Sequence, residues 1–367
     1  MTTWSVVKDD TQENGRRRRH FRYAVFSLAA LLVLSLGFVL IPREPQVPPT
    51  PPFSEQARAS AYSDALSLRA AGLAFERASG DARSGPQAAA VNRAVTLLTV
   101  HARALMLPGG SAASGPPASP ASSPPAAAAA PSASELAGAL QASAARRLKD
   151  AETADGGMAR LLAGAGTAQL LAAEDIAKAA GIALAAAPVA DIPDAGAHSP
   201  TAQATDKSTA SAAASCPAQP PGDGTSLGSA LASAVAAELE LVYAYQAALT
   251  RLDAGSAVPA SGFLAQHQDL HGDAEALGRA SCAPAVPQPA GYPLSQAFLA
   301  APATALGALE AGSLPVYGDL VALSEGSGRA WAISALQSAA RRTLHWGSPP
   351  GTLPGLVLAE SELPELP

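Results

Sequence analysis

The sequence predicts an all-α protein. Hydrophobic residues make up 48% of the chain and aromatic residues only 4%, because alanine supplies most of the apolar side chains. Alanine-rich segments without strand-forming residues favour helices, and helices that are poor in aromatic side chains pack closely through small ones. Many of the 32 prolines stand in tracts between these segments. We therefore expect helices that are separated by proline-rich connections.

A basic block and an apolar run open the chain. The block at 16–22 contains five arginines, and the run of about 19 residues at 23–41 has no charged or strongly polar side chain. A run of this length spans a hydrocarbon core of about 30 Å as a helix, and basic flanks stay on the cytoplasmic side. We therefore predict a single-pass protein of the cell membrane, with a cytoplasmic tail at 1–22, a transmembrane helix at 23–41 and an extracytoplasmic remainder.

Two export signals are alternatives to this anchor. A cleavable signal has a shorter apolar stretch and a small-x-small cleavage site, whereas this run leads directly into Pro42 without such a site. The run Arg18-Arg19-His20-Phe21 partly matches a twin-arginine signal, which would imply export of an already folded domain. No cysteine follows the apolar run, which excludes a lipoprotein anchor. We adopt the anchor and keep twin-arginine export as the open alternative.

The part of the chain after the anchor is acidic. Six of the 24 basic residues and three of the 30 acidic residues precede the anchor, which leaves 18 against 27 and a net charge of −9. Nucleic-acid binding depends on basic patches that neutralise phosphates, so nucleic acid is not an expected partner. The basic block before the anchor instead suits the anionic inner leaflet of the membrane.

The two cysteines, Cys216 and Cys282, both fall on the predicted outer side. In an oxidising compartment a pair of cysteines is expected to form a disulfide. Closing a loop of about 65 residues would stabilise the fold by roughly 4 kcal/mol in the chain-entropy model. Two unrelated buried thiols are the alternative.

A proline-rich spacer at 42–53 follows the anchor, and it favours an extended conformation because proline disrupts helix interiors. A helical domain is predicted at 54–187, since apolar residues recur there at spacings of three and four. Ser134, just before Glu135, is a candidate N-cap within it. The insert at 108–131 has too few large apolar side chains to offset its ordering entropy, and we predict that it is disordered. Two helices are expected before this insert and two after it.

A linker at 188–224, rich in Pro, Ala, Ser and Thr, leads to a second helical region at 225–347, and a tail at 348–367 closes the chain. Two helices, a long proline-rich connection and two more helices are predicted in this region. That order is the topology of ferritin-like four-helix bundles. The four helices are expected at about 226–252, 261–280, 295–325 and 328–346.

Short segments of the second region carry a resemblance to a known family. They are Ala237 to Tyr245 in the first helix, the surroundings of His267 in the second, Ala308-Leu309-Glu310 with Tyr317 in the third, Ala339-Ala340-Arg341 to Trp346 in the fourth, and the closing Leu353-Pro354-Gly355-Leu356. Through these segments, 225–357 resembles the ferritin-like domain of unknown function found in secreted and membrane proteins of actinobacteria. The resemblance implies a ferritin-like fold and no established activity.

Three ionisable residues, Glu238, His267 and Glu310, interrupt the predicted apolar stripes. Burying an unpaired carboxylate costs several kcal/mol, so such groups are usually paired, neutral or bound to a metal. Di-iron bundles take one Glu from each of two helices and a Glu-x-x-His motif from each of the other two. Here Leu264 and Arg342 stand where the motif needs Glu. The sequence therefore does not predict a di-iron centre.

Three arrangements of these ionisable residues remain open. They could form, with Tyr245 and Tyr317, a satisfied hydrogen-bond network that fixes the register of the bundle. They could instead hold one iron, manganese or zinc ion, with His271 one turn further along as an added ligand. One or more of them could also be partly exposed. We favour the network without a cofactor and keep the single metal ion as the alternative.

No arrangement of Ser, Cys and His indicates nucleophilic catalysis, and no glycine run has the strand-then-helix context of a phosphate loop. We therefore expect a non-catalytic scaffold or partner-binding module of the cell envelope, with an unidentified envelope protein as its partner. A metal-dependent redox bundle is the alternative from the enzyme class. A third possibility is assembly, in which bundles pair side by side as a homo-oligomer.

Overall fold

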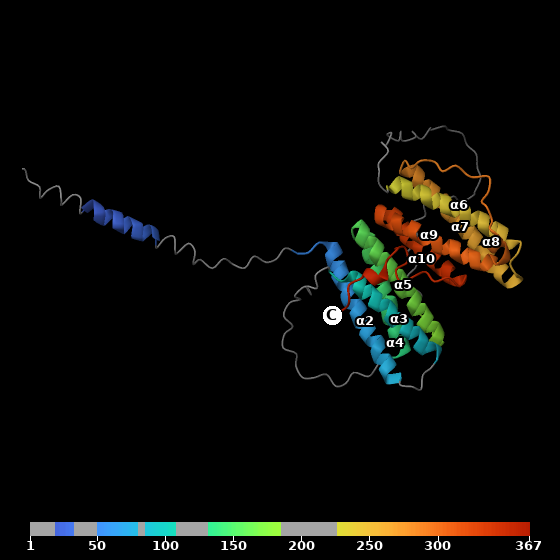
Figure 1. The fold of residues 1–367 in the computed structure, drawn as a ribbon, viewed down its shortest axis with the longest axis horizontal. Coiled ribbons are helices and arrows are strands. Elements are labelled where there is room, and N and C mark those ends of the chain that lie inside the picture. Colours follow the sequence, from blue (N-terminus) through green and yellow to red (C-terminus); the bar gives the residue numbers. More distant parts are fainter. Residues whose placement is uncertain (1–18, 33–49, 80–84, 108–130, 185–225) are drawn as a thin grey trace, which may run out of the picture. The chain divides into compact units, whose positions relative to one another are not determined.

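The computed structural model describes residues 19–32, 50–79, 85–107, 131–184 and 226–367 (Figure 1). The chain divides into two compact units, Met1–Pro51 and Pro52–Pro367. All regular elements within the described ranges are helical, which confirms the predicted all-α class.

In the first unit, residues 19–32 form a helix with exposed side chains. This helix contains the first part of the predicted transmembrane segment, and the rest of that segment, 33–41, lies outside the described residues. Most of the cytoplasmic tail and of the proline-rich spacer lies outside them as well. The anchor and its orientation therefore stay predictions.

Among the described helices, one is long and apolar enough to cross a membrane, and it lies in the second unit: α6 (Leu227–Leu249). The apolar side chains of α6 pack in the interior of the protein. The helix contacts α7 and α9, and it carries the fully buried carboxylate of Glu238. The core helix of a folded domain can have the same length and composition. This helix is therefore no evidence for a membrane span.

The second unit begins with four helices in which α2 packs against α3, α4 against α5, and α5 against α3. The N-cap of helix α4 is Ser132, two residues before the predicted cap at Ser134. Ser132 accepts a hydrogen bond from the backbone N–H of Glu135, and the Glu135 carboxylate accepts one from the Ser132 backbone, so two otherwise unpaired donors are satisfied. The four helices are α2 (Phe53–Ser79), α3 (Pro86–Leu105), α4 (Ala133–Thr153) and α5 (Gly156–Ala180).

The remaining elements differ from the prediction at two boundaries. Helix α7 includes the predicted break at 255–259, because the Asp253 side chain caps its first N–H groups and the proline at 259 removes only one later backbone bond. The predicted helix at 295–325 is divided, since Pro302 starts a new helix at its first position. The elements are α6, α7 (Ala254–Ala280), α8 (Gln296–Ala300), α9 (Pro302–Leu323), α10 (Gly326–His345) and the 3₁₀ turn η2 (Glu360–Glu362).

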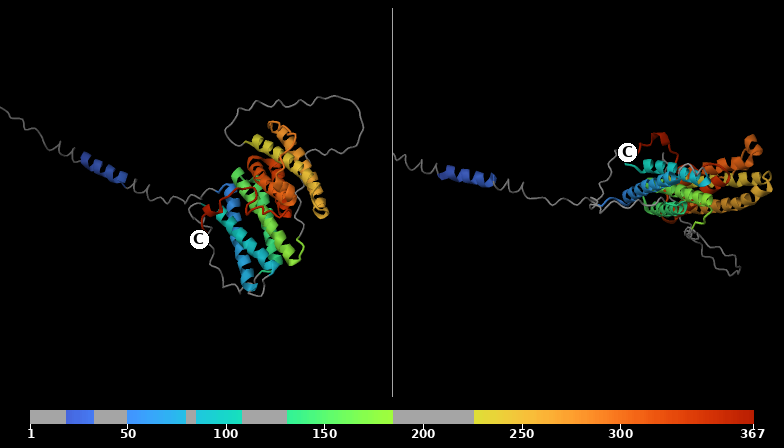
Figure 2. Two further views of the ribbon diagram at one scale, coloured as in Figure 1. Left: turned by 45° about the vertical axis from the view of Figure 1, so that its right-hand side comes forward. Right: turned by 90° about the horizontal axis from the view of Figure 1, so that it is seen from below.

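The helices on either side of 188–224 share one hydrophobic cluster. Ala159 and Leu162 of α5 belong to the same cluster as Leu320 and Val321 of α9, and α5 packs against both α9 and α10. Figure 2 shows this neighbourhood from two further directions. The segments predicted as separate domains, 54–187 and 225–347, therefore lie in one compact unit, whereas the linker predicted between them lies outside the described residues.

The segment predicted as a tail is packed against both groups of helices. We call residues 351–367 the C-terminal strap. Its Leu353, Pro354 and Gly355 are buried. Two helical glycines leave room for its backbone. A Cβ at Gly164 of α5 would lie 2.7 Å from the Pro354 carbonyl oxygen, and a Cβ at Gly318 of α9 would lie 2.0 Å from the Gly355 carbonyl oxygen. The strap thus joins α5 to α9.

Side chains of the first helices also hold the strap by its carbonyl groups. Arg160 Nε donates to the Gly355 carbonyl at 2.7 Å, and Arg103 Nη2 donates to the Leu363 carbonyl at 2.6 Å. His101 Nε2 lies 2.8 Å from the Thr352 carbonyl, and its Nδ1 lies 3.3 Å from the amide nitrogen of Gln169. Because a carbonyl only accepts and an amide nitrogen only donates, this imidazole is neutral with its proton on Nε2.

We expect stability to fall with acidification because of His101. Burial lowers the pKa of this imidazole from 6.5 to about 4, although the Thr352 carbonyl acts in the opposite direction. A lowered folded pKa makes the unfolded chain bind the proton first, so the free energy of unfolding should decrease from pH 6.5 towards pH 4, by about 3 kcal/mol in all. Urea titrations across this range measure it.

The matched control is His101→Gln, whose amide can still donate to the Thr352 carbonyl but does not titrate. Between pH 6.5 and 5 the slope should be shallower in the variant than in the native protein, because the carboxylates and His267 contribute to both proteins alike and only His101 differs. An unchanged slope in the variant would refute the assignment.

Candidate functional site

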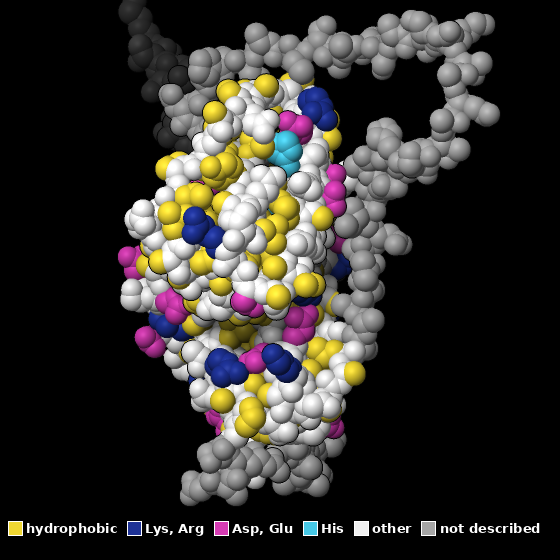
Figure 3. Space-filling model, turned by 90° about the vertical axis from the view of Figure 1, so that its right-hand side faces the viewer, with side chains coloured by type: hydrophobic (Ala, Val, Ile, Leu, Met, Phe, Trp, Pro, Cys, Tyr) yellow, Lys and Arg dark blue, Asp and Glu magenta, His cyan; other side chains and the backbone are white. Residues whose placement is uncertain are grey.

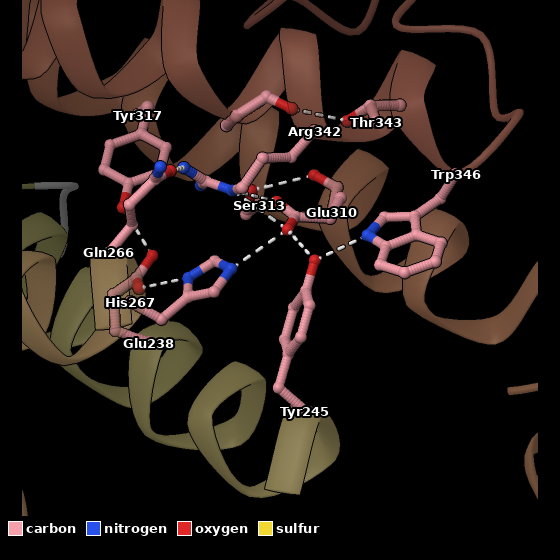
Figure 4. Close-up of polar contacts among 11 residues, drawn as sticks. Glu238, Tyr245, Gln266, His267, Glu310, Ser313, Tyr317, Arg342, Thr343 and Trp346 are labelled. Carbon is pink, nitrogen blue, oxygen red and sulfur yellow. Dashed lines mark hydrogen bonds and ion pairs between the residues drawn. The ribbon is translucent and has the colours of Figure 1, made fainter. Parts of the chain in front are cut away.

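A cluster of polar side chains lies inside the second unit, between α6, α7, α9 and α10 (Figure 4). We call it the polar core. Each of the four helices contributes at least one side chain, and Glu238, His267 and Glu310 are fully buried. Its members are Glu238, Tyr245, His267, Glu310, Tyr317, Arg342 and Trp346.

Helical register explains how these side chains meet. Glu238 lies one turn after Val235 on the buried face of α6, and Glu310 lies one turn after Leu306 on that of α9. His267 is one of only four buried residues of α7. The structure therefore brings together the three ionisable residues that interrupt the apolar stripes of the sequence.

His267 stands between the two carboxylates. Its Nδ1 lies 2.7 Å from Glu238 Oε2, and its Nε2 lies 2.9 Å from Glu310 Oε1. Ionised carboxylates only accept hydrogen bonds, so both ring nitrogens donate and the ring is an imidazolium. Burial alone would lower the pKa of His267, but the hydrogen bonds and charges of Glu238 and Glu310 outweigh it and raise that pKa above its ordinary value.

Arg342 completes the charge balance. Its Nε donates to both carboxylate oxygens of Glu310, at 2.9 and 3.0 Å. Burial would raise the pKa of Glu310, but the contacts with His267, Arg342 and Tyr245 hold that pKa below its ordinary value. Two carboxylates then face an imidazolium and a guanidinium, so the polar core is neutral as a whole.

The remaining carboxylate contacts come from tyrosine hydroxyls. Tyr245 donates to Glu310 Oε1 at 2.6 Å and accepts from Trp346 Nε1 at 2.6 Å, and Tyr317 donates to Glu238 Oε1. Burial and the neighbouring carboxylates raise the pKa of both phenols, so they stay protonated donors. Every oxygen of the two carboxylates accepts at least one hydrogen bond.

The donor set does not fit a metal ion. An imidazole binds a metal through a nitrogen lone pair, whereas both nitrogens of His267 donate to carboxylates. The guanidinium of Arg342 occupies the motif position that would carry a Glu ligand, and it supplies the positive charge that a metal would bring. His271 faces Glu275 of the same helix, 3.8 Å from its Nε2, and makes no hydrogen bond or ion pair with a residue of the polar core. The described residues hold no group of three His, Cys, Asp or Glu side chains arranged for a metal.

Sequence reasoning placed Tyr245 and Tyr317 in this network but missed Arg342 and Trp346. The signal was present: Arg342 follows the buried Ala339 by three residues and Trp346 follows Arg342 by four, so both continue an apolar stripe of α10. A basic residue on a buried stripe requires an anionic partner inside the fold. Comparison with the Glu-x-x-His motif shows only that position 342 lacks a glutamate, and it does not indicate what the arginine binds.

Cys282 is disulfide-bonded. It follows the C-terminal end of α7 with φ 55°, a left-handed conformation that is uncommon for residues other than glycine. Cys216, the other cysteine of the sequence, lies outside the described residues. The predicted pairing of Cys216 with Cys282 therefore stays a prediction.

Residues 230–358 match a family model that is described as Domain of unknown function (DUF4439). The matched range contains every residue of the polar core and the first part of the strap. A comparison with curated proteins and one with solved structures find no match to this chain. The C-terminal part of the chain is thus a domain whose activity is uncharacterised.

Proposed function

We propose that this chain is a membrane-anchored, extracytoplasmic protein whose C-terminal domain is a ferritin-like four-helix bundle that serves as a non-catalytic scaffold or partner-binding module of the cell envelope. The basic block and apolar run at the N-terminus support the anchor and its orientation. The observation that carries the functional part is the buried, neutral polar core, in which every carboxylate oxygen accepts a hydrogen bond from another side chain of the protein.

The order of the helices supports the ferritin-like assignment. α6 packs against α7, a connection without helix at 281–295 follows, and α9 packs against α10 and α6. Polar residues from all four helices project into the interior, as the ligands of di-iron bundles do. In this chain the same interior positions form ion pairs and hydrogen bonds among themselves.

The polar core supports a structural role for the bundle. A general acid or base must reach the proton that it transfers, whereas Glu238, His267 and Glu310 have 0% exposure. The outer surface is better suited to contacts with a partner: on the face drawn in Figure 3, apolar side chains cover much of the surface and basic and acidic side chains are interspersed.

Metal analysis of the purified full-length protein tests the non-catalytic assignment. We expect no stoichiometric iron, manganese or zinc, because the donor atoms that would bind it are already paired. Glu238→Gln is the informative variant, since it changes one candidate ligand with little change in volume. Stoichiometric metal in the native protein that is lost in Glu238→Gln would instead establish the metal-dependent redox bundle.

Cysteine labelling of intact cells tests the topology. We expect a membrane-impermeant maleimide to label Ala59→Cys and not Asp10→Cys, because the basic block should keep the N-terminus inside. Permeabilised cells, in which both positions should react, provide the control. The opposite pattern in intact cells would refute the orientation, and labelling of both positions would refute the anchor.

A further inference from the structure

A cavity of about 490 Å³ opens on the outer side of α6 and α9. Its walls come from four places in the sequence: α6, the connection that leads into α8, α8 itself, and the first half of α9. The volume falls within the range of small-molecule sites, roughly 300 to 1,000 Å³. No residue of the polar core lines it, so the cavity and the buried network are separate features.

The floor of the cavity is apolar. Ala244, Phe298 and Leu309 line it, and further alanines of α8 and α9 widen it because they place only a methyl group on its wall. Ala244 and Phe298 are buried, so they belong to the packed interior and form the bottom of the cavity. Such a floor suits the hydrocarbon body of a ligand.

Two tyrosines form an aromatic wall. Tyr243 of α6 and Tyr292 of the connection lie with their ring centroids 5.6 Å apart and their planes inclined at 52°. Both rings line the cavity and both are half-buried. The faces of tyrosine rings attract organic cations, with an energy that grows as the site loses water.

Glu240 is the one charged side chain among the lining residues, and no Lys or Arg lines the cavity. It lies one turn before Tyr243 and Ala244 on the same face of α6. Within the described part of the chain, it has no ion-pair or hydrogen-bond partner. Burial and the negative charge of Glu240 raise the pKa of Tyr292, so this carboxylate acts electrostatically on the aromatic wall.

We propose that this cavity binds a small organic cation with an apolar body, such as a quaternary ammonium compound that carries an aryl or alkyl group. The ammonium group is held by the rings of Tyr243 and Tyr292 and by the carboxylate of Glu240, and the apolar body lies on Ala244, Phe298 and Leu309. This inference goes beyond the proposed scaffold role and does not depend on it.

Calorimetric titration of the full-length protein with benzyltrimethylammonium and with its uncharged isostere neopentylbenzene tests the proposal. We expect the cation to bind about tenfold more tightly than the isostere, from the sum of cation–π and carboxylate attraction. Glu240→Gln should weaken binding of the cation about tenfold and leave binding of the isostere unchanged. Tyr243→Phe should keep the preference for the cation, and Tyr243→Leu should reduce it.

Asp269→Asn is the matched control, because it neutralises an exposed carboxylate of α7 that does not line the cavity. It should change neither affinity. Equal binding of cation and isostere, or an unchanged preference in Glu240→Gln, would overturn the proposal. Absence of binding by the cation to the native protein would overturn it as well.

Discussion

Replacing Glu310 by leucine should lower the free energy of unfolding by about 4 kcal/mol, the range found when one member of a buried ion pair is removed. Glu310 accepts hydrogen bonds from Tyr245, His267 and Arg342. Without its carboxylate the polar core carries a net positive charge, because the imidazolium and the guanidinium then share only Glu238. Equilibrium unfolding in urea at pH 7 measures the difference.

The double variant Glu310→Leu with Arg342→Met separates charge from packing. It removes one charge of each sign, so the polar core is neutral again. We expect it to recover about 2 kcal/mol of the loss, since a hydrophobic replacement of a buried pair is often close to neutral. Glu174→Gln, which breaks the exposed pair with Arg341, should cost less than about 1 kcal/mol. A double variant as unstable as the single one would contradict a charge-based explanation.

Gly318→Ala is expected to cost about 3 kcal/mol, because the added methyl group would clash with the backbone of the strap. A Cβ at this position of α9 would lie 2.0 Å from the carbonyl oxygen of Gly355 and 2.8 Å from its Cα. The strap cannot move away without losing the hydrogen bond from Arg160 to the same carbonyl. Thermal and urea unfolding should both show the loss, and proteolysis should begin in the strap.

Gly312→Ala is the matched control on the same helix. Nothing lies within 4 Å of a Cβ at this exposed position. Alanine is a better helix former than glycine, so the variant should be more stable than the native protein by about 0.5 to 1 kcal/mol. A similar loss of stability in the two variants would show that α9 tolerates alanine poorly at any glycine, and that the close approach of the strap is not the cause.

The helix class and the meeting of Glu238, His267 and Glu310 followed from the sequence, because helical periodicity alone assigns residues to one face. Arg342 was missed, since an amphipathic stripe records which residues are apolar and does not record which charges face one another. The helix continues through Pro259 because the Asp253 side chain caps its first N–H groups, and a proline considered alone predicts a break there. In both cases the signal lies in a combination of residues and not in any one of them.

The strap could not be predicted in this way. Its sequence has no hydrophobic periodicity. Much of its attachment is through backbone carbonyl groups, which are present at every residue and therefore leave no pattern in the sequence. The residues that hold it, such as His101 and Arg103, lie more than 240 positions earlier in the chain. The hydrogen bond from His101 to Thr352 joins residues that are 251 positions apart. Gly164 and Gly318 do not predict the position of the strap either, because a glycine in a helix indicates a close approach only when the neighbouring segment is known.

The strap also orders events in time. Ribosomes deliver the N-terminus first, so α3 and α5 exist before the carbonyls that His101, Arg103 and Arg160 bind have been synthesised. Contacts of such long range slow folding, because the intervening chain must be brought together before they contribute. The interior between α5 and α9 can close only after the strap has left the ribosome, which makes this closure a late step of folding.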